Sequence, residues 1–128
     1  LLHVHSEGAV EIIEAMQADA NAYMPALNIP NRGALPGLPD WAIVEVPAIV
    51  NRHGIHGVHM PALPRALTEI CRREAELASV VIDAAVSGDR NLALQELLLD
   101  PMMNDIERAK AILDDFVISF REWLPQFA

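Results

Sequence analysis

The sequence has little of what several classes of protein require. Its one cysteine, Cys71, excludes an internal disulfide and favours a reducing compartment such as the cytoplasm. Basic residues are scarce, nine against eighteen acidic ones, and the net charge of −9 argues against nucleic acid or an anionic membrane surface as the main partner. No run reaches the roughly 18 apolar residues that a membrane-spanning helix needs.

Apolar residues, by contrast, are abundant. They make up 52% of the 128 residues, which is enough to bury a core and argues against disorder. We therefore expect a single domain over residues 1–128. The chain opens Leu-Leu-His-Val-His, with no initiator methionine and no signal-peptide pattern, so we expect it to be a fragment of a longer protein.

The most informative stretch covers residues 28–50. A polar turn, Asn28-x-x-Asn31-x-Gly33, opens a loop over residues 30–40 that holds three prolines and two glycines. An apolar run follows over residues 43–50. This run is β-branched and nearly continuous, which predicts a strand covered on both faces.

A second strand is predicted over residues 23–29, where a short apolar stretch lies between breakers. Pro25 within it indicates an edge position or a bulge. In the strand over residues 43–50, Glu45 is the exception to the apolar character. Its charge needs a partner, such as Arg32 or Arg65, or else faces a site.

The rest of the chain has the 3.6-residue apolar period of helices. The first helix is expected to begin near Ser6, as N-cap, and to run to about residue 19. After a loop or irregular hairpin over residues 51–64, a long helix runs from about Pro64 to Gly88, a natural C-cap. Its apolar stripe comprises Leu67, Ile70, Cys71, Leu77, Ala78, Val81, Ile82 and Ala85.

Two shorter signals organise the C-terminal third. Asp89 is expected to cap a short helix that stops at Asp100-Pro101, because a residue before proline avoids the α region. Asn104-x-x-Glu107 resembles a capping box for the last helix. The apolar face of that helix comprises Ile106, Ala109, Leu113, Phe116, Val117, Phe120, Trp123 and Leu124.

These elements predict a mixed α+β fold in which helix dominates, rather than an alternating βαβ pattern. The sequence contains no G-x-G-x-x-G turn after a strand and no P-loop. It therefore has no visible dinucleotide or nucleotide fingerprint.

The histidines and the cysteine have ordinary interpretations. His53, His56 and His59 lie three apart in a glycine-rich loop, and no carboxylate or cysteine completes a ligand spacing nearby. We interpret them as surface or interface residues, with a metal site as the alternative. Cys71 lies on the apolar stripe of the long helix, which favours a buried core cysteine over a reactive thiol.

Asn28, Asn31 and Arg32 are the candidate site residues. They lie between a strand and a Gly/Pro loop, where polar side chains fix a turn or line a cleft. Both interpretations are open: an Asx-turn stabilised locally, or a cleft wall near a sugar or a cofactor.

The run NIPNRGALPGLPD over residues 28–40, followed by Val44-Glu-Val-Pro47, resembles the C-terminal domain of family 4 glycoside hydrolases. These are the NAD- and manganese-dependent α-glucosidases, α-galactosidases, α-galacturonidases and 6-phosphoglycosidases. The resemblance continues through Ala84-Ala-Val-Ser-Gly-Asp-Arg90 and Leu97-Leu-Leu-Asp-Pro101. It covers about residues 6–118, in the order that the family has.

The resemblance implies a helix-rich α+β fold like the C-terminal half of lactate and malate dehydrogenases, with a small β portion and two long helices. It also implies an unusual reaction in the full-length enzyme. NAD transiently oxidises the sugar at C3, which acidifies the C2 proton. A base and Mn²⁺ then permit elimination of the leaving group, water adds, and the ketone is reduced again.

The resemblance places the dinucleotide motif and the metal-binding cysteine and histidine upstream of these residues. No catalytic, NAD-binding or metal-binding residue is therefore carried over to this chain, and Cys71 does not match the ligand cysteine of the family. The opening residues 1–7 would precede a helix that borders the active site.

The favoured hypothesis is that the chain is the substrate-side and oligomerisation domain of such a glycosidase and is inactive alone. The full-length enzyme is then expected to be cytoplasmic and homo-oligomeric, and to bind a glycoside as its substrate. The sequence looks closer to the α-glucosidase and α-galactosidase branch than to the 6-phospho branch. The alternative is a non-enzymatic helical interaction domain, with Phe116, Phe120 and Trp123 on a partner surface.

Overall fold

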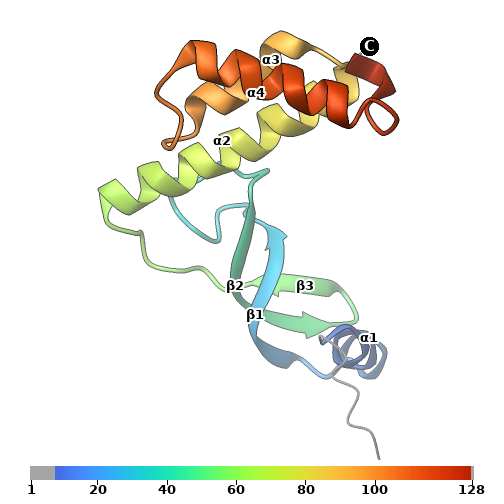
Figure 1. The fold of residues 1–128 in the computed structure, drawn as a ribbon. Helices are drawn as coiled ribbons and strands as arrows, with labels where there is room; N and C mark the ends of the chain where they lie inside the picture. Colours follow the sequence, from blue (N-terminus) through green and yellow to red (C-terminus); the bar gives the residue numbers. More distant parts are fainter. Residues whose placement is uncertain (1–7, 128) are drawn as a thin grey trace, which may run out of the picture. The chain divides into compact units, whose positions relative to one another are not determined.

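The computed structural model describes residues 8–127, which form an α+β fold rich in helix, as the sequence predicts (Figure 1). In chain order the elements are α1 (Ala9–Ala18), β1 (Ala22–Pro30), β2 (Ile43–Asn51), β3 (Gly54–Gly57), α2 (Arg65–Ser87), α3 (Arg90–Leu99), α4 (Ile106–Ser119) and a 3-10 turn, η1 (Pro125–Phe127). Internal contacts divide the chain into two compact units, the first ending at Thr68 and the second beginning at Glu69. None of the helices among the described residues is both long and apolar enough to cross a membrane.

The first unit is built on a three-stranded antiparallel sheet in the order β1-β2-β3. Strand β1 lies at an edge, and its register shifts between Met24 and Leu27, around Pro25. Proline cannot donate to the ladder, so an edge and an irregularity are where it is tolerated. Both parts of the prediction for Pro25 are confirmed.

Strand β2 differs from its prediction in how it is covered. Burial alternates along the strand: Val44, Val46, Ala48 and Val50 are buried, while Ile43 is 65% exposed and Glu45 is exposed as well. The prediction of a strand covered on both faces is therefore wrong for the described residues. Proline and β-branched residues fill the open face, so the sequence lacked the polar alternation that marks a half-covered strand.

The covered face of the sheet forms the core of the first unit. Ile29, Ala34, Val44 and Val46 are buried together, with Leu27, Leu35, Leu38 and Met60 packed against them. The loop between β1 and β2 supplies Ala34, Leu35 and Leu38, so it closes over the sheet rather than extending away from it. Packing against the sheet fixes the position of the candidate loop.

Where a loop or irregular hairpin was predicted, β2 and β3 form a hairpin of regular register, with Asn51 opposite Gly54, and it is tied back to the end of α1. The Arg52 Nε donates to the Asp19 Oδ2 at 2.7 Å, and the Arg52 backbone N–H donates to Oδ1 at 3.2 Å. These bonds from Arg52 hold the pKa of the Asp19 carboxyl below its usual value.

Helix α1 begins later than predicted. Its first residue is Ala9, preceded by Gly8 in the left-handed region at φ +79°, with no side-chain cap. Ser6, the predicted N-cap, lies outside the described residues. The helix ends at Ala18, where Asp19 turns the chain at φ +52°.

In the second unit, two of the predicted helix ends are confirmed. Helix α2 stops at Ser87, and Gly88 adopts φ +70° while its N–H donates to the Ala84 carbonyl at 2.8 Å. A side chain on Gly88 would place its Cβ 1.9 Å from the Gln126 carbonyl oxygen, so the position excludes any larger residue. Asp89 then caps α3 by accepting from the Asn91 N–H at 2.7 Å.

The start and end of α4 correct the prediction. The N-cap is Asp105, not Asn104: its carboxylate accepts from the backbone N–H of Glu107 at 2.9 Å and of Arg108 at 3.2 Å. Aspartate and asparagine are both strong caps, so pattern alone could not choose between neighbours. The helix ends at Ser119, and Phe120 and Leu124 belong to the irregular turn that precedes η1.

The core of the second unit comprises Ala84, Val117 and Phe127, with Leu92, Ala93, Leu113 and Leu124 packed against it. The predicted stripe of α2 is only partly right. Leu77 is buried, but Leu67, Ile70, Val81 and Ile82 are between 45% and 61% exposed. Cys71 is half-buried rather than a core residue. Apolar residues surround the C-terminal half of α2, so their period did not single out one face.

Candidate functional site

The loop between β1 and β2 is organised by Asn31, which is 1% exposed. Its Nδ2 donates to the carbonyls of Leu35 and Leu38 at 3.0 Å each and of Pro39 at 3.3 Å. Its Oδ1 accepts from the Leu35 N–H at 2.7 Å. The side chain thus supplies the hydrogen bonds that a proline-rich loop cannot make through its own backbone. The bonds stay within the loop, but they join Asn31 to residues four to eight positions further on rather than to residue i+2 as in an Asx-turn.

Arg32 and Gly33 form a left-handed turn beside Asn31. Arg32 has φ +43° and Gly33 has φ +84°. The Arg32 N–H donates to the Asp40 carbonyl at 3.1 Å, and the Ala34 N–H donates to the Asn31 carbonyl at 2.7 Å. The Arg32 side chain is exposed, and within residues 8–127 its guanidinium makes no ion pair or hydrogen bond.

The loop and the sheet line a hollow of about 430 Å³ in the first unit, which is open to solvent. The polar residues that line it are Asn28, Asn31, Arg32 and His59, and Ile29 and Ile55 are among the apolar ones. Gly57 also lines the hollow, and a Cβ there would lie 2.6 Å from the Ile29 Cδ1. A side chain at Gly57 would therefore require the Ile29 side chain to shift.

His59 joins this site, although the sequence analysis placed it with the other loop histidines and not with Asn28, Asn31 and Arg32. Its Nδ1 lies 2.9 Å from the Gly33 carbonyl oxygen, and the next residue, Met60, donates its N–H to the Ala34 carbonyl at 2.8 Å. Sequence separation of 26 residues hides this contact. The segment after β3 therefore ties down the turn that carries Arg32.

The three candidate residues take different positions. Asn28 and Arg32 are exposed and line one hollow. The Asn31 side-chain amide, by contrast, is buried and makes its hydrogen bonds within the loop. Glu45 lies opposite Asn28 in the β1–β2 register, and in the described part of the chain it pairs with neither Arg32 nor Arg65. Its carboxylate is exposed to solvent instead.

The histidines do not converge. The His56 Nε2 lies 3.3 Å from the Asn51 Oδ1, while His59 contacts Gly33 across the loop. Across residues 8–127, no three His, Cys, Asp or Glu side chains group in a way that could hold a metal ion. The donor set that Mn²⁺ would need is thus not assembled by these residues.

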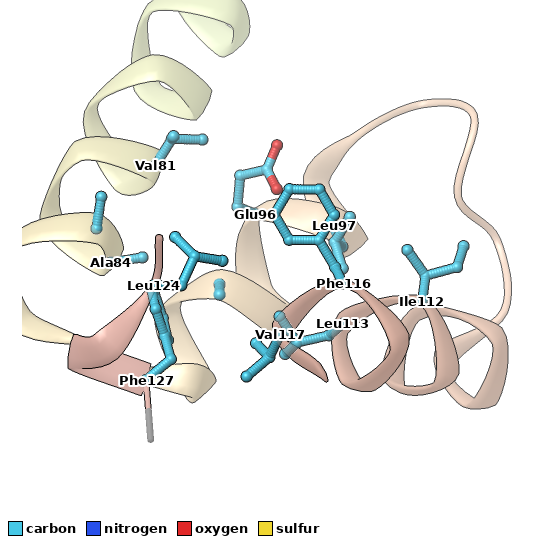
Figure 2. A pocket seen from close by; sticks show the side chains of 12 residues that line it. Val81, Ala84, Glu96, Leu97, Ile112, Leu113, Phe116, Val117, Leu124 and Phe127 are labelled. Carbon is cyan, nitrogen blue, oxygen red and sulfur yellow. The ribbon is translucent and has the colours of Figure 1, made fainter. Parts of the chain in front are cut away.

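A second hollow, of about 440 Å³, lies in the second unit and is almost wholly apolar (Figure 2). Residues from α2, α3, α4, η1 and the turn before η1 line it, among them Val81, Ala84, Leu97, Phe116, Leu124 and Phe127. Glu96 is the charged residue of its lining (Figure 2), and burial together with the nearby Asp100 carboxylate raises the pKa of the Glu96 carboxyl. This hollow has few groups that could orient a polar ligand.

Comparison with known proteins decides the family. The sequence model described as the family 4 glycosyl hydrolase C-terminal domain matches residues 2–103 of the chain. The chain belongs to this family. The match contains the whole of the candidate loop and all of the sheet.

Relatives of known activity agree with the family 4 assignment. The chain is 31% identical over 118 residues to an α-glucosidase of Erwinia rhapontici, and 32% identical over 126 residues to an α-galactosidase of Rhizobium meliloti (strain 1021). These alignments cover 92% and 96% of the chain but 26% of each relative. The chain thus spans about a quarter of the length of the curated relatives that it matches.

Solved structures show the same fold. Two crystal structures of a 6-phospho-α-glucosidase from gut microorganisms match with TM-scores of 0.81 and 0.84, at 24% and 21% identity. They cover 97% and 98% of this chain, which spans 28% of each. One holds NAD and glucose 6-phosphate, the other NAD and Mn²⁺. The α+β fold described above is therefore the fold of family 4 C-terminal domains.

The described residues, 8–127, do not by themselves fit either cofactor. They offer no three-ligand group for Mn²⁺, and their sequence has no glycine-rich turn after a strand to receive the pyrophosphate of NAD. No step of a reaction that uses these groups is derived from the residues of this domain.

Proposed function

We propose that this chain is the C-terminal, substrate-side and oligomerisation domain of a longer, cytoplasmic glycosidase, and that it is inactive alone. The full-length enzyme would hydrolyse α-glycosides by NAD-assisted oxidation and elimination. The observation that carries the proposal is the family 4 match over residues 2–103, together with relatives that are α-glycosidases. Their greater length supports an additional, dinucleotide-binding part in the parent protein.

Within this proposal, the loop between β1 and β2 forms a wall of the substrate cleft. Asn28 and Arg32 are exposed beside an open hollow, where their amide and guanidinium groups can donate hydrogen bonds to sugar hydroxyls. Asn31 would act indirectly, because its side chain holds the conformation of the loop that carries Arg32. We assign the catalytic groups, NAD and Mn²⁺ to the rest of the enzyme.

Turnover by the chain and by its complete parent protein tests this proposal. Each would be incubated with NAD, Mn²⁺ and a panel of aryl α-glucosides and α-galactosides. We expect the complete protein to hydrolyse at least one of them and the chain of residues 1–128 to hydrolyse none. Robust turnover by the chain alone would contradict the proposal.

One observation favours a second candidate, an interaction domain without enzymatic function. The apolar side chains near the end of the chain are exposed: Phe116 at 52%, Phe120 at 46% and Trp123 at 80%. The rings of Phe116 and Phe120 lie 4.6 Å apart between centroids, so they form one apolar patch. A patch of this kind marks a protein contact surface.

Sequence upstream of the chain separates the two candidates. A strand–turn–helix of the G-x-G type in the parent gene would favour the glycosidase, because such a turn binds the pyrophosphate of a dinucleotide. A parent protein without one would favour the interaction domain.

We expect the chain to self-associate in either case, because of these exposed apolar side chains. Sedimentation velocity over a range of concentrations measures this directly. Trp123→Ser should shift the equilibrium towards the monomer. A wild-type chain that stays monomeric at high concentration would contradict an oligomerisation role.

A further inference from the structure

Helix α1 has few internal sources of stability. It is 10 residues long, and Gly8 at its start makes no side-chain cap bond. Isolated helices shorter than about 12 residues are marginal in water, because fixing the first turn costs more entropy than its one hydrogen bond offsets. The helix therefore depends on contacts with the rest of the first unit.

Apolar packing supplies only part of these contacts. Ala15 is the one buried residue of the helix, and an alanine side chain removes little apolar surface from water. Ile12 and Met16 are half-buried. Val10 and Ile13 are 52% and 55% exposed, so neither contributes much to packing against the sheet. Polar contacts at the end of the helix must therefore matter.

These polar contacts join the end of α1 to the hairpin turn between β2 and β3 (Figure 1). The Arg52 Nε donates to the Asp19 Oδ2 at 2.7 Å, the Arg52 Nη2 donates to the same oxygen, and the Arg52 backbone N–H donates to Oδ1 at 3.2 Å. The Asn51 Nδ2 donates to the Asn21 Oδ1 at 2.9 Å. We call Asp19, Asn21, Asn51 and Arg52 the latch.

The latch restrains a backbone conformation that needs support. Asp19 has φ +52° and Asn21 has φ +49°, and this left-handed region costs free energy for a residue with a side chain. Aspartate and asparagine tolerate it best, but such conformations persist where surrounding contacts fix them. The latch bonds fix both residues. Their loss would free the backbone where α1 joins β1.

The latch is also open to solvent. The Arg52 side chain is 66% exposed and that of Asp19 is 34% exposed. Ion pairs at such exposure are weak and are screened by salt. Strand β2, by contrast, carries the buried residues Val46, Ala48 and Val50. Opening of α1 should therefore cost less free energy than opening of the sheet.

We propose that α1 is a conditional helix. The latch keeps it ordered, and opening of the latch releases residues 9–18 as a disordered segment while the sheet stays folded. Order–disorder transitions of one segment are a common form of conformational switch. Ionic strength operates this one, because the latch includes an ion pair. The proposal is independent of the glycosidase proposal, since it involves no substrate and no cofactor.

Hydrogen–deuterium exchange of the wild-type chain, followed by mass spectrometry of its peptides at pH 7, tests this switch. Exchange is compared at low salt and in roughly 1 M NaCl, where the Debye length falls to about 3 Å. We expect salt to speed the exchange of residues 9–18 by about threefold, as the loss of an exposed ion pair gives. The exchange of residues 43–51 should not change.

Variants assign the effect to the latch. In Asp19→Asn, residues 9–18 should exchange about threefold faster than in the wild type at low salt, and salt should add nothing. Asparagine adopts the left-handed conformation as readily as aspartate, so this substitution removes the charge without adding strain. Arg52→Gln should behave alike, and the double variant should exchange no faster than either single one, because all three break the same pair.

Lys110→Gln is the matched control. It removes one positive charge, as Arg52→Gln does, and breaks an exposed ion pair with Glu107 within α4. The exchange of residues 9–18 should match that of the wild type in this variant.

Either of two results overturns the proposal. One is exchange of residues 9–18 that neither salt nor Arg52→Gln changes. The other is faster exchange of residues 9–18 and 43–51 together, which would mean that α1 opens only when the whole unit unfolds. The salt experiment uses the wild type, so it decides between these results even if a variant fails to fold.

Discussion

At the scale of single residues, Asn31 shows how a polar residue next to a site can act without touching a ligand. Its side chain is buried and bonds four times to its own loop, while its neighbour Arg32 is exposed with no partner within residues 8–127. The division follows from backbone geometry. Arg32 and Gly33 turn through left-handed conformations, so the two side chains leave the chain in different directions.

Asn31→Ala should lower the free energy of unfolding of the first unit by about 2–3 kcal/mol, because three partly buried carbonyls and one N–H lose their partner. Asn28→Ala is the control, and should change stability by less than about 0.5 kcal/mol, as an exposed surface substitution does. Urea unfolding measured by Trp41 fluorescence in a Trp123→Phe background reports on the first unit alone. Equal effects of the two substitutions would show that the Asn31 bonds do not hold the loop.

From the sequence, Asn28, Asn31 and Arg32 could be named as candidates for the site, but not which of them holds the loop. An asparagine before a Gly/Pro loop fits a local turn and a cleft wall equally well, since both need a short polar side chain. The contact between His59 and the candidate loop could not have been found at all. His59 reaches Gly33 from 26 residues away, and no local period encodes such a contact.

At the scale of elements, helix-breaking and helix-capping residues predicted the ends of helices well. The spacing of apolar residues predicted the buried face of a helix less well. Gly88, Asp89 and Pro101 mark helix ends where the sequence placed them, because each acts on the backbone beside it. The apolar stripe of α2 was less informative. Burial depends on which neighbour packs against the helix, and a helix with apolar residues on several faces does not say which face that is.

The corrected cap of α4 can be checked by substitution. Asp105→Ala should cost about 1 kcal/mol, because the N–H groups of Glu107 and Arg108 lose their acceptor. Asn104→Ala should cost much less, since Asn104 is exposed and makes no bond to the helix start. Both are measured by urea unfolding followed by circular dichroism. A larger effect of Asn104→Ala would restore the capping box that the sequence suggested.

At the scale of the whole molecule, the family could be predicted from the sequence. Which apolar side chains are exposed to solvent could not. Several motifs in one order identified family 4, and the match over residues 2–103 confirms it. The open face of β2 and the exposed aromatic residues near the C-terminus have the composition of a core. A sequence specifies apolar surface, but what covers that surface depends on other parts of the protein or on partners.

The proposed role of the domain is a wall of the substrate cleft, with the chemistry in the rest of the enzyme. Steady-state kinetics of the complete enzyme with Arg32→Gln test this most directly, with Arg108→Gln as the control. We predict a KM for the aryl α-glycoside that rises about tenfold, as the loss of one charge-assisted hydrogen bond gives, with kcat within about twofold of the wild type. A collapse of kcat at unchanged KM, or no change in either constant, would contradict it.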